Sequence, residues 1–303
     1  MQYFPLFVDT VNLNVLLVGA GDVASRKLAL LTRTEANIHV VAPEVNPEVQ
    51  RYADAGRILL SQREVVHADI QNYDLVYLAT ANDSLNAELA TLATARGIWV
   101  NAVDNPAFCR FITPSIVDRG RLVVAISTAG AAPVFARTIR SRLESSLPQS
   151  LKPLFDFVAD RRVEVQDKLD STSKRRLFWE RFFDTNGDRF DSRTTEHYHN
   201  AFNNLVSRGE ILLLDDATSV DLLPLAAMPL LQRLDWIYSQ GDLSVELAEL
   251  VRRDADRGFL PAFSELSQQY ELGTRMLLVA DTQKISLLKA HFPMAKHLRP
   301  GAI

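Results

Sequence analysis

A glycine-rich turn near the start of the chain carries the clearest chemical signal. An apolar run at residues 15–18 leads into Gly-Ala-Gly-Asp-Val-Ala at residues 19–24, and residues 23–33 have helical character. In such a motif Gly19 permits a tight turn, Gly21 lets backbone approach a pyrophosphate, and Ala24 lets the helix pack closely. Its place between a strand and a helix predicts a dinucleotide site, against the alternative of a turn without a ligand.

The second strand ends beside an acid. The apolar run at residues 38–42 is followed by Pro43 and Glu44, where a dinucleotide site usually carries the acid that holds the adenosine ribose. No arginine stands at this strand end to receive a 2′-phosphate, so the sequence favours NAD over NADP. The predicted cofactor-binding residues are Gly19, Gly21, Asp22, Val23, Pro43, Glu44 and Thr80.

A further aspartate precedes a basic stretch. Asp104 follows the apolar run at residues 99–103, and residues 105–142 hold six arginines against one acid, Asp118. An aspartate at a strand end can act as a general base, although Asp-Asn-Pro is also typical of a plain turn. The positive charge is typical of a solvated face, and it equally suits a polyanionic small molecule.

The elements that must position these residues alternate along the first half of the chain. Apolar runs occur at residues 15–18, 38–42, 58–60, 75–79, 99–103 and 122–126, with helical segments at 23–33, 46–56 and 83–97. This series predicts a Rossmann-type doubly wound parallel sheet. Residues 151–183 then have helical spacing with a helix start at 171–173, residues 184–208 suit a polar linker, and 211–214 suit a strand.

We therefore expect an α/β protein in three parts. They are an NAD-binding Rossmann domain at residues 1–145, a small helical domain at 146–205 and a short α/β segment at 206–303. The net charge of −4 argues against nucleic acid as a partner, and no apolar stretch approaches the roughly 20 residues that span a bilayer. The absence of a signal-peptide pattern and the single cysteine, Cys109, favour a reducing cytoplasm.

Several ordered motifs together resemble a known family. They are residues 4–7, 18–24, 26–27, 79–83, 101–104, 111–115, 125–130, 132–137 and 175–179. Over residues 1–185 the chain resembles siroheme synthase and the related precorrin-2 dehydrogenases/sirohydrochlorin ferrochelatases. The resemblance implies NAD-linked oxidation of precorrin-2 to sirohydrochlorin, insertion of Fe(II) as a substrate to give siroheme, and a homodimer built by the helical part.

The resemblance also assigns roles to single residues. Asp104 matches the family's catalytic aspartate, which would take the proton and act as a transient Fe(II) ligand. The tetrapyrrole carries eight carboxylates, so the predicted substrate-binding residues are Arg110, Arg119, Thr128, Arg137 and Arg140. Arg137 and Arg140 could equally be exposed helix charges, and Thr128 could simply cap a helix.

The last segment resembles the start of the methyltransferase half of siroheme synthase, mainly through residues 250–257. Its working parts differ, because residues 215–220 replace a glycine-rich loop for S-adenosylmethionine and Gln240 replaces a catalytic aspartate. The region near Ala262 also lacks the family's lysine. The sequence thus predicts a degenerate remnant without methyltransferase activity.

Two other functions are compatible with the glycine motif alone. One is an NAD-dependent dehydrogenase of another small anionic metabolite, and the other is a non-catalytic dinucleotide-sensing or tetrapyrrole-binding module. Neither alternative accounts for the ordered motifs as well as the resemblance to siroheme synthase does. His197 and His199 have metal-like composition but lie in the predicted linker, and Cys109 is interpreted as a small packing residue more readily than as a site thiol.

Overall fold

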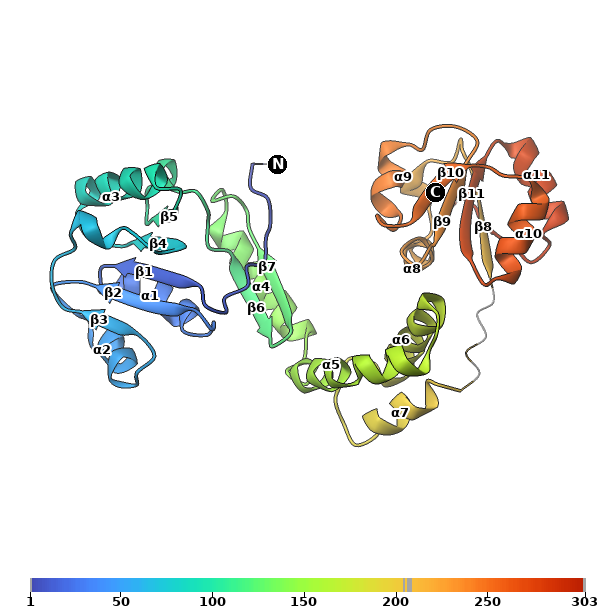
Figure 1. The fold of residues 1–303 in the computed structure, drawn as a ribbon. Coiled ribbons are helices and arrows are strands. Elements are labelled where there is room, and N and C mark those ends of the chain that lie inside the picture. Colours follow the sequence, from blue (N-terminus) through green and yellow to red (C-terminus); the bar gives the residue numbers. More distant parts are fainter. Residues whose placement is uncertain (1, 204, 206–208, 302–303) are drawn as a thin grey trace. The chain divides into compact units, whose positions relative to one another are not determined.

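The computed structural model describes residues 2–203, 205 and 209–301 (Figure 1). The chain divides into two compact units, Met1–Asp118 with Val123–Ser146 and Arg119–Leu122 with Leu147–Ile303. The first unit contains one parallel sheet, and the second contains a group of helices and another parallel sheet. Every helix within the described ranges is too short or too polar to cross a membrane.

Five parallel strands form the sheet of the first unit, in the order β3-β2-β1-β4-β5 (Figure 1). They are β1 (Asn14–Val18), β2 (Asn37–Val41), β3 (Leu59–Ser61), β4 (Leu75–Leu78) and β5 (Trp99–Ala102). The helices are α1 (Asp22–Leu31), α2 (Pro47–Asp54) and α3 (Asp83–Ala95), with 3-10 turns η1 (His67–Asp69) and η2 (Pro106–Phe108). The predicted Rossmann-type sheet is confirmed.

Burial on both faces explains why these strands appear as continuous apolar runs. Along β1, Val15 and Leu17 pack with residues of α1 and α2, whereas Leu16 and Val18 pack with residues of α3. This alternation follows from the two-residue period of a strand. Because all five strands are parallel, the loops after β1, β2, β4 and β5 meet at one edge of the sheet.

The prediction that residues 122–126 continue the parallel series is wrong. They form β7 (Leu122–Ile126), which pairs with β6 (Ser115–Arg119) in a separate two-stranded sheet. Only Gly120 and Arg121 connect the two strands, and so short a connection joins antiparallel strands, since a parallel pair needs a crossover. Gly120 has a φ of +72°, which suits this tight turn. The helix α4 (Pro133–Ser146) follows β7.

Three helices begin the second unit: α5 (Leu151–Lys168), α6 (Thr172–Asn186) and α7 (Thr194–Asn200). Ser171 caps α6, as predicted, by accepting a hydrogen bond from Lys174 N at 3.3 Å. The helices enclose an aromatic core that includes Phe157, Phe178, Phe182 and Tyr198.

The prediction that residues 184–208 form a polar linker is wrong for much of that range. The helix α6 runs through Asn186, and α7 occupies the middle of the range. Tyr198 and Thr194 are fully buried, because the Tyr198 ring packs edge-on against Phe157 and Phe178. One buried aromatic residue therefore anchors a segment whose composition is otherwise polar.

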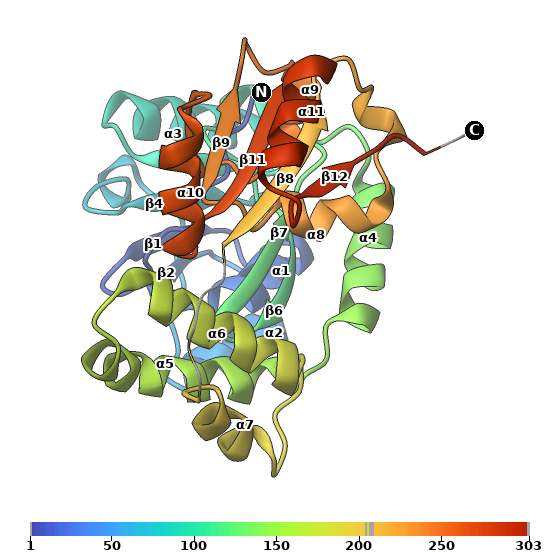
Figure 2. The same cartoon turned by 90° about the vertical axis from the view of Figure 1, so that its right-hand side faces the viewer.

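The C-terminal part of the second unit is a complete five-stranded α/β layer structure. Its strands are β8 (Glu210–Asp215), β9 (Trp236–Ser239), β10 (Asp256–Phe259), β11 (Arg275–Ala280) and β12 (Lys296–Leu298). They are all parallel, in the order β10-β9-β11-β8-β12, and the run β9, β11, β8 and β12 can be followed in Figure 2. The helices are α8 (Met228–Leu231), α9 (Val245–Leu250), α10 (Phe263–Glu271) and α11 (Thr282–His291), with η3 (Val220–Leu222) and η4 (Leu225–Ala227). Each face of the sheet has its own buried core.

Candidate active site

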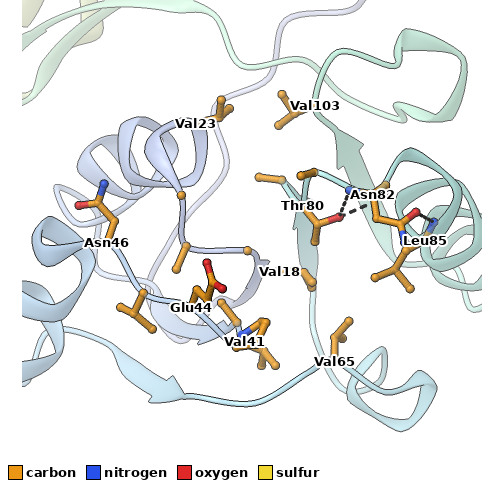
Figure 3. A pocket seen from close by; sticks show the side chains of 18 of the residues that line it. Val18, Val23, Val41, Glu44, Asn46, Val65, Thr80, Asn82, Leu85 and Val103 are labelled. Carbon is orange, nitrogen blue, oxygen red and sulfur yellow. Dashed lines mark hydrogen bonds between the residues drawn. The ribbon is translucent and has the colours of Figure 1, made fainter.

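A pocket of about 1040 Å³ lies at the carboxyl ends of the strands of the first sheet (Figure 3). The loops after β1, β2, β4 and β5 line it. Every predicted cofactor-binding residue and the predicted catalytic residue line this pocket: Gly19, Gly21, Asp22, Val23, Pro43, Glu44, Thr80 and Asp104. Ligands in doubly wound sheets bind at this edge, so the pocket is the candidate active site.

Glycine is needed at positions 19 and 21 of the motif for different structural reasons. Gly19 has a φ of +102°, and a Cβ on it would lie 2.5 Å from the Ala79 carbonyl oxygen, so the fold itself requires glycine there. A Cβ on Gly21 would meet no atom within 4 Å. Gly21 is the residue that precedes α1, so it leaves free space at the N-terminal end of that helix, where a helix favours an anion.

Asp22 is held by a residue that the sequence did not mark as part of the site. Asn46 Nδ2 donates to Asp22 Oδ1 at 2.9 Å, and Asn46 N donates to Ala20 O at 3.0 Å. Asn46 also caps α2, since its Oδ1 accepts from Glu48 N at 2.8 Å. From the sequence, Asn46 was recognised only as a helix start. In the structure it also joins the glycine loop to the loop after β2.

Glu44 follows β2 and its carboxylate is directed into the pocket, whereas Val23 and Val103 lie across from each other at another side (Figure 3). The described residues that line the pocket include five acids and neither lysine nor arginine: the acids are Asp22, Glu44, Glu64, Asp83 and Asp104. A pyrophosphate in this pocket would therefore depend on backbone N–H groups. A further phosphate near Glu44 would meet only negative charge.

Thr80 follows β4, and its hydroxyl is already engaged within the protein. Thr80 Oγ1 donates to Asn86 Oδ1 at 2.8 Å, and buried Asn86 returns a bond to Thr80 O at 3.0 Å. Thr80 Oγ1 also accepts from Asn82 N at 3.2 Å (Figure 3). Asn82 caps α3 through Leu85 N. Asn82, Leu85 and Val65 also line the pocket and were not predicted as site residues from the sequence, although Asn82 belongs to the loop after β4 and Leu85 to the first turn of α3.

Asp104 occupies a turn after β5 and is solvent-exposed. Its φ of +57° lies in the left-handed region, where residues with a Cβ are uncommon. Such a conformation persists only when the surrounding structure holds it, and it occurs often at active sites. The turn brings Asp104 to the same pocket as the glycine loop.

The residues predicted to bind substrate do not line this pocket. Arg110, Arg137 and Arg140 belong to the first unit and are exposed. Thr128 lies before α4, and its Oγ1 accepts from Ala132 N at 3.1 Å, which closes the loop that leads into that helix. Arg119 is 3% exposed and donates from Nε to Leu147 O at 2.9 Å, which argues for a structural role within the second unit.

Within the described ranges, no group of three or more histidine, cysteine, aspartate or glutamate side chains is arranged to hold a metal ion. His197 and His199 both lie on α7.

Comparisons with known proteins agree with this arrangement. Residues 6–115 match a family model described as NAD(P)-binding, residues 119–146 match the sirohaem biosynthesis protein central model, and residues 150–203 match the sirohaem synthase dimerisation region. A siroheme synthase of Pseudoalteromonas atlantica is 41% identical over 268 residues, which are 85% of this chain and 58% of that protein. A siroheme synthase of Actinobacillus succinogenes is 37% identical over 300 residues, which are 94% of this chain and 61% of that protein.

A solved structure of SirC, a precorrin-2 dehydrogenase, superposes with a TM-score of 0.53 and 25% identity. It covers 66% of this chain, which in turn covers 98% of SirC. The chain spans about three-fifths of the length of the curated siroheme synthases that it matches.

The fold and the pocket define a Rossmann-type, NAD(P)-binding protein with a dimerisation region. More particularly, residues 6–203 correspond to the N-terminal region of siroheme synthases, with its NAD-binding, central and dimerisation domains.

The different surroundings of the two glycines lead to a testable contrast. Gly19→Ala should lower the free energy of unfolding by about 1–3 kcal/mol or more, because a Cβ there adds backbone strain and a clash with Ala79 O. Gly21→Val should unfold at the wild-type denaturant concentration yet bind NAD at least about tenfold more weakly. Denaturant unfolding and NAD titration by fluorescence measure the two effects.

Gly97→Ala is the matched control, since Gly97 has a φ of +75° and open space around it. Gly97→Ala should lower the free energy of unfolding through backbone strain alone, and it should leave the affinity for NAD unchanged. Unchanged NAD affinity in folded Gly21→Val would exclude the glycine loop from the cofactor site.

Proposed function

We propose that this chain oxidises precorrin-2 to sirohydrochlorin with NAD and then inserts Fe(II) to give siroheme. The observation that carries the proposal is the meeting of Asp104 with the glycine loop and Glu44 at one pocket. The similarity to siroheme synthases and to SirC supports precorrin-2 as the substrate. The reaction belongs in the cytoplasm, where Cys109 would stay reduced.

The residues present fit a dinucleotide. Gly21 leaves space at the start of α1 for the pyrophosphate, and Glu44 follows β2, where it can accept hydrogen bonds from ribose hydroxyls. Bound NAD would supply the hydride acceptor. Asp104, at the same pocket, would take the proton that the substrate loses as its ring system is oxidised, so that two hydrogens leave as hydride and proton.

The substrate carries eight carboxylates, and the pocket itself offers five acids and no cation among its described lining residues. The tetrapyrrole side chains must therefore be bound outside the cofactor pocket. Exposed Arg110, Arg137 and Arg140, with Thr128, remain the proposed residues for them, because guanidinium groups bind carboxylates in bidentate geometry. Buried Arg119 is left out of this set.

We propose that Asp104 also acts in the second step, the insertion of Fe(II). Its carboxylate would bind Fe(II) transiently or accept pyrrole protons as the metal enters, since a single carboxylate can ligate Fe(II) without the full set of ligands that would retain it. One carboxylate would thereby serve both steps. Both steps would take place in the Rossmann domain proposed for residues 1–145.

A homodimer is proposed for the helical domain at residues 146–205, which holds the matched dimerisation region. Its surface has a groove of about 510 Å³ between α5 and α6, where Phe155, Val158, Trp179 and Phe183 stand beside Arg162 and Arg175. Aromatic and arginine side chains are enriched in protein interfaces. A second copy of the chain is therefore the proposed occupant.

NAD should support sirohydrochlorin formation with a kcat/KM at least about tenfold higher than NADP, because Glu44 would repel a 2′-phosphate. Glu44→Ala should narrow that ratio by improving the use of NADP. The ratio of the two kcat/KM values is measured from steady-state rates with each cofactor, monitored through the absorbance of sirohydrochlorin. Equal kcat/KM values in the wild type would contradict the role of Glu44.

Asp104→Ala should reduce the dehydrogenation rate by about 100- to 10,000-fold with unchanged NAD affinity, since loss of a general base has that effect. Asp104→Asn is the matched variant, because asparagine tolerates the left-handed turn but cannot take the proton. It should be equally inactive. Rates within threefold of wild type would end the assignment, and iron insertion that persists in both variants would leave Asp104 a role in dehydrogenation alone.

We further propose that the C-terminal segment, residues 206–303, has no methyltransferase activity. At the carboxyl ends of its strands, Asp215 Oδ1 accepts from Ala217 N at 3.0 Å and Gln240 Oε1 accepts from Asp281 N at 3.2 Å. Asp215 therefore closes its own loop, whereas Gln240 joins the loop after β9 to the segment after β11. Asp215 and Asp216 also add charge where backbone would have to approach S-adenosylmethionine.

Calorimetric titration of the full chain with S-adenosylmethionine should accordingly show no binding. Incubation of both with uroporphyrinogen III should yield no methylated product. An active siroheme synthase serves as the positive control. Micromolar affinity for the methyl donor, or measurable methyl transfer, would identify the segment as a divergent but functional domain.

A further inference from the structure

Backbone hydrogen bonds hold the residues on both sides of Asp104. Asn105 N donates to Ala102 O at 3.3 Å, and Val103 N donates to Leu78 O at 2.9 Å. The left-handed Asp104 lies between these two bonded residues. Its orientation therefore depends on how firmly residues 102 and 105 are held.

Cys109 reaches both of those residues. Its Sγ lies 3.2 Å from Ala102 O and 3.4 Å from Asn105 O, so the thiol bridges the carbonyls on either side of the Asp104 turn. Cys109 N in addition donates to Pro106 O at 3.1 Å, which closes η2. A side chain predicted from the sequence to be simple packing thus makes polar contacts on both sides of the proposed catalytic residue.

The side chain of Asn101 also contacts the sulfur of Cys109. Asn101 is 6% exposed, and its Nδ2 lies 3.6 Å from Cys109 Sγ and 2.9 Å from Phe111 O. The next residue is also fastened, because Arg110 N donates to Val100 O at 2.8 Å. The sulfur is thereby placed by a buried amide on β5 and by backbone on both sides, which leaves it little freedom to move.

The thiol is suited to this contact as a hydrogen-bond donor. Burial raises the pKa of Cys109 above its ordinary value of 9.0, so the group carries its proton at neutral pH. An S–H group is a weak donor, and a hydroxyl is a stronger donor of similar shape. Serine should therefore replace cysteine in this role, whereas alanine should not.

We propose that Cys109 is a positioning residue, which holds Asp104 in its left-handed turn through the Ala102 and Asn105 carbonyls. The proposal rests on the proposed function of Asp104. Cys109 touches neither substrate nor cofactor in this role, so its loss should reduce the rate of the chemical step and leave cofactor binding intact.

Cys109→Ala should lower kcat for precorrin-2 oxidation by about tenfold, since small displacements of a catalytic group have effects of that order, with KM for NAD unchanged. Cys109→Ser should keep kcat within about threefold of wild type, since its hydroxyl restores the donor. Thr34→Ala is the matched control. It removes a hydroxyl that donates to Leu31 O at 2.6 Å at the opposite end of β2, and should leave kcat unchanged.

Hydrogen exchange supplies a readout that does not need turnover. In Cys109→Ala the amides of residues 103–110 should exchange faster than in wild type, and in Cys109→Ser they should not. Unchanged exchange in Cys109→Ala, or equal kcat in the alanine and wild-type proteins, would overturn the proposal. If the wild type shows no precorrin-2 oxidation, the proposed function fails, and the exchange rates still decide whether Cys109 holds the turn.

Thermal unfolding of each variant separates a general loss of stability from a local one. A Cys109→Ala protein with a wild-type melting temperature, faster local exchange and lower kcat supports positioning. A lower melting temperature that Cys109→Ser shares, with lower kcat in both variants, would make Cys109 a packing residue and overturn the proposal.

Discussion

Backbone contact between the turn after β1 and the end of β4 is the constraint on which the pocket depends. Gly19 lies so near the Ala79 carbonyl that any side chain there would clash, and Gly19 N donates to Val41 O at 2.9 Å. One residue thus joins the carboxyl ends of β1, β2 and β4. Because these ends converge, the free space at Gly21, the acid after β2 and the turn after β5 come to one place.

Two anionic molecules would be bound by different means in the proposed function. The cofactor pocket is lined by acids, so its ligand phosphates depend on the backbone at the start of α1, where negative charge is stabilised without a cation. The arginines lie elsewhere on the first unit and on the exposed surface. In the proposed function these guanidinium groups would meet the carboxylates of the substrate, away from the phosphates of the cofactor.

The second sheet is stabilised by the apolar cores on its two faces. Its two faces bury continuous apolar clusters, with Leu212 and Leu277 on one face and Ile211 and Leu278 on the other, all inaccessible or nearly so. At its carboxyl ends, Asp215 bonds within its own loop and Gln240 bonds to Asp281 N after β11. Burial of apolar side chains maintains such a fold whether or not the loops retain the residues that a ligand needs.

The sequence by itself determined the first sheet and the glycine loop, because apolar runs and glycine spacing are local patterns that a parallel sheet turns into one edge. Residues 122–126 show its limit, since the same apolar run suits a strand of the parallel sheet or of a hairpin, and only the structure shows that it pairs with β6. Asn46 and Cys109 show another. Each is ordinary in the sequence, and each becomes part of the site only where distant segments meet, Asn46 through Asp22 and Cys109 through the carbonyls beside Asp104. Only the tertiary structure could decide these contacts, because hydrogen bonds between loops depend on where the sheet places them.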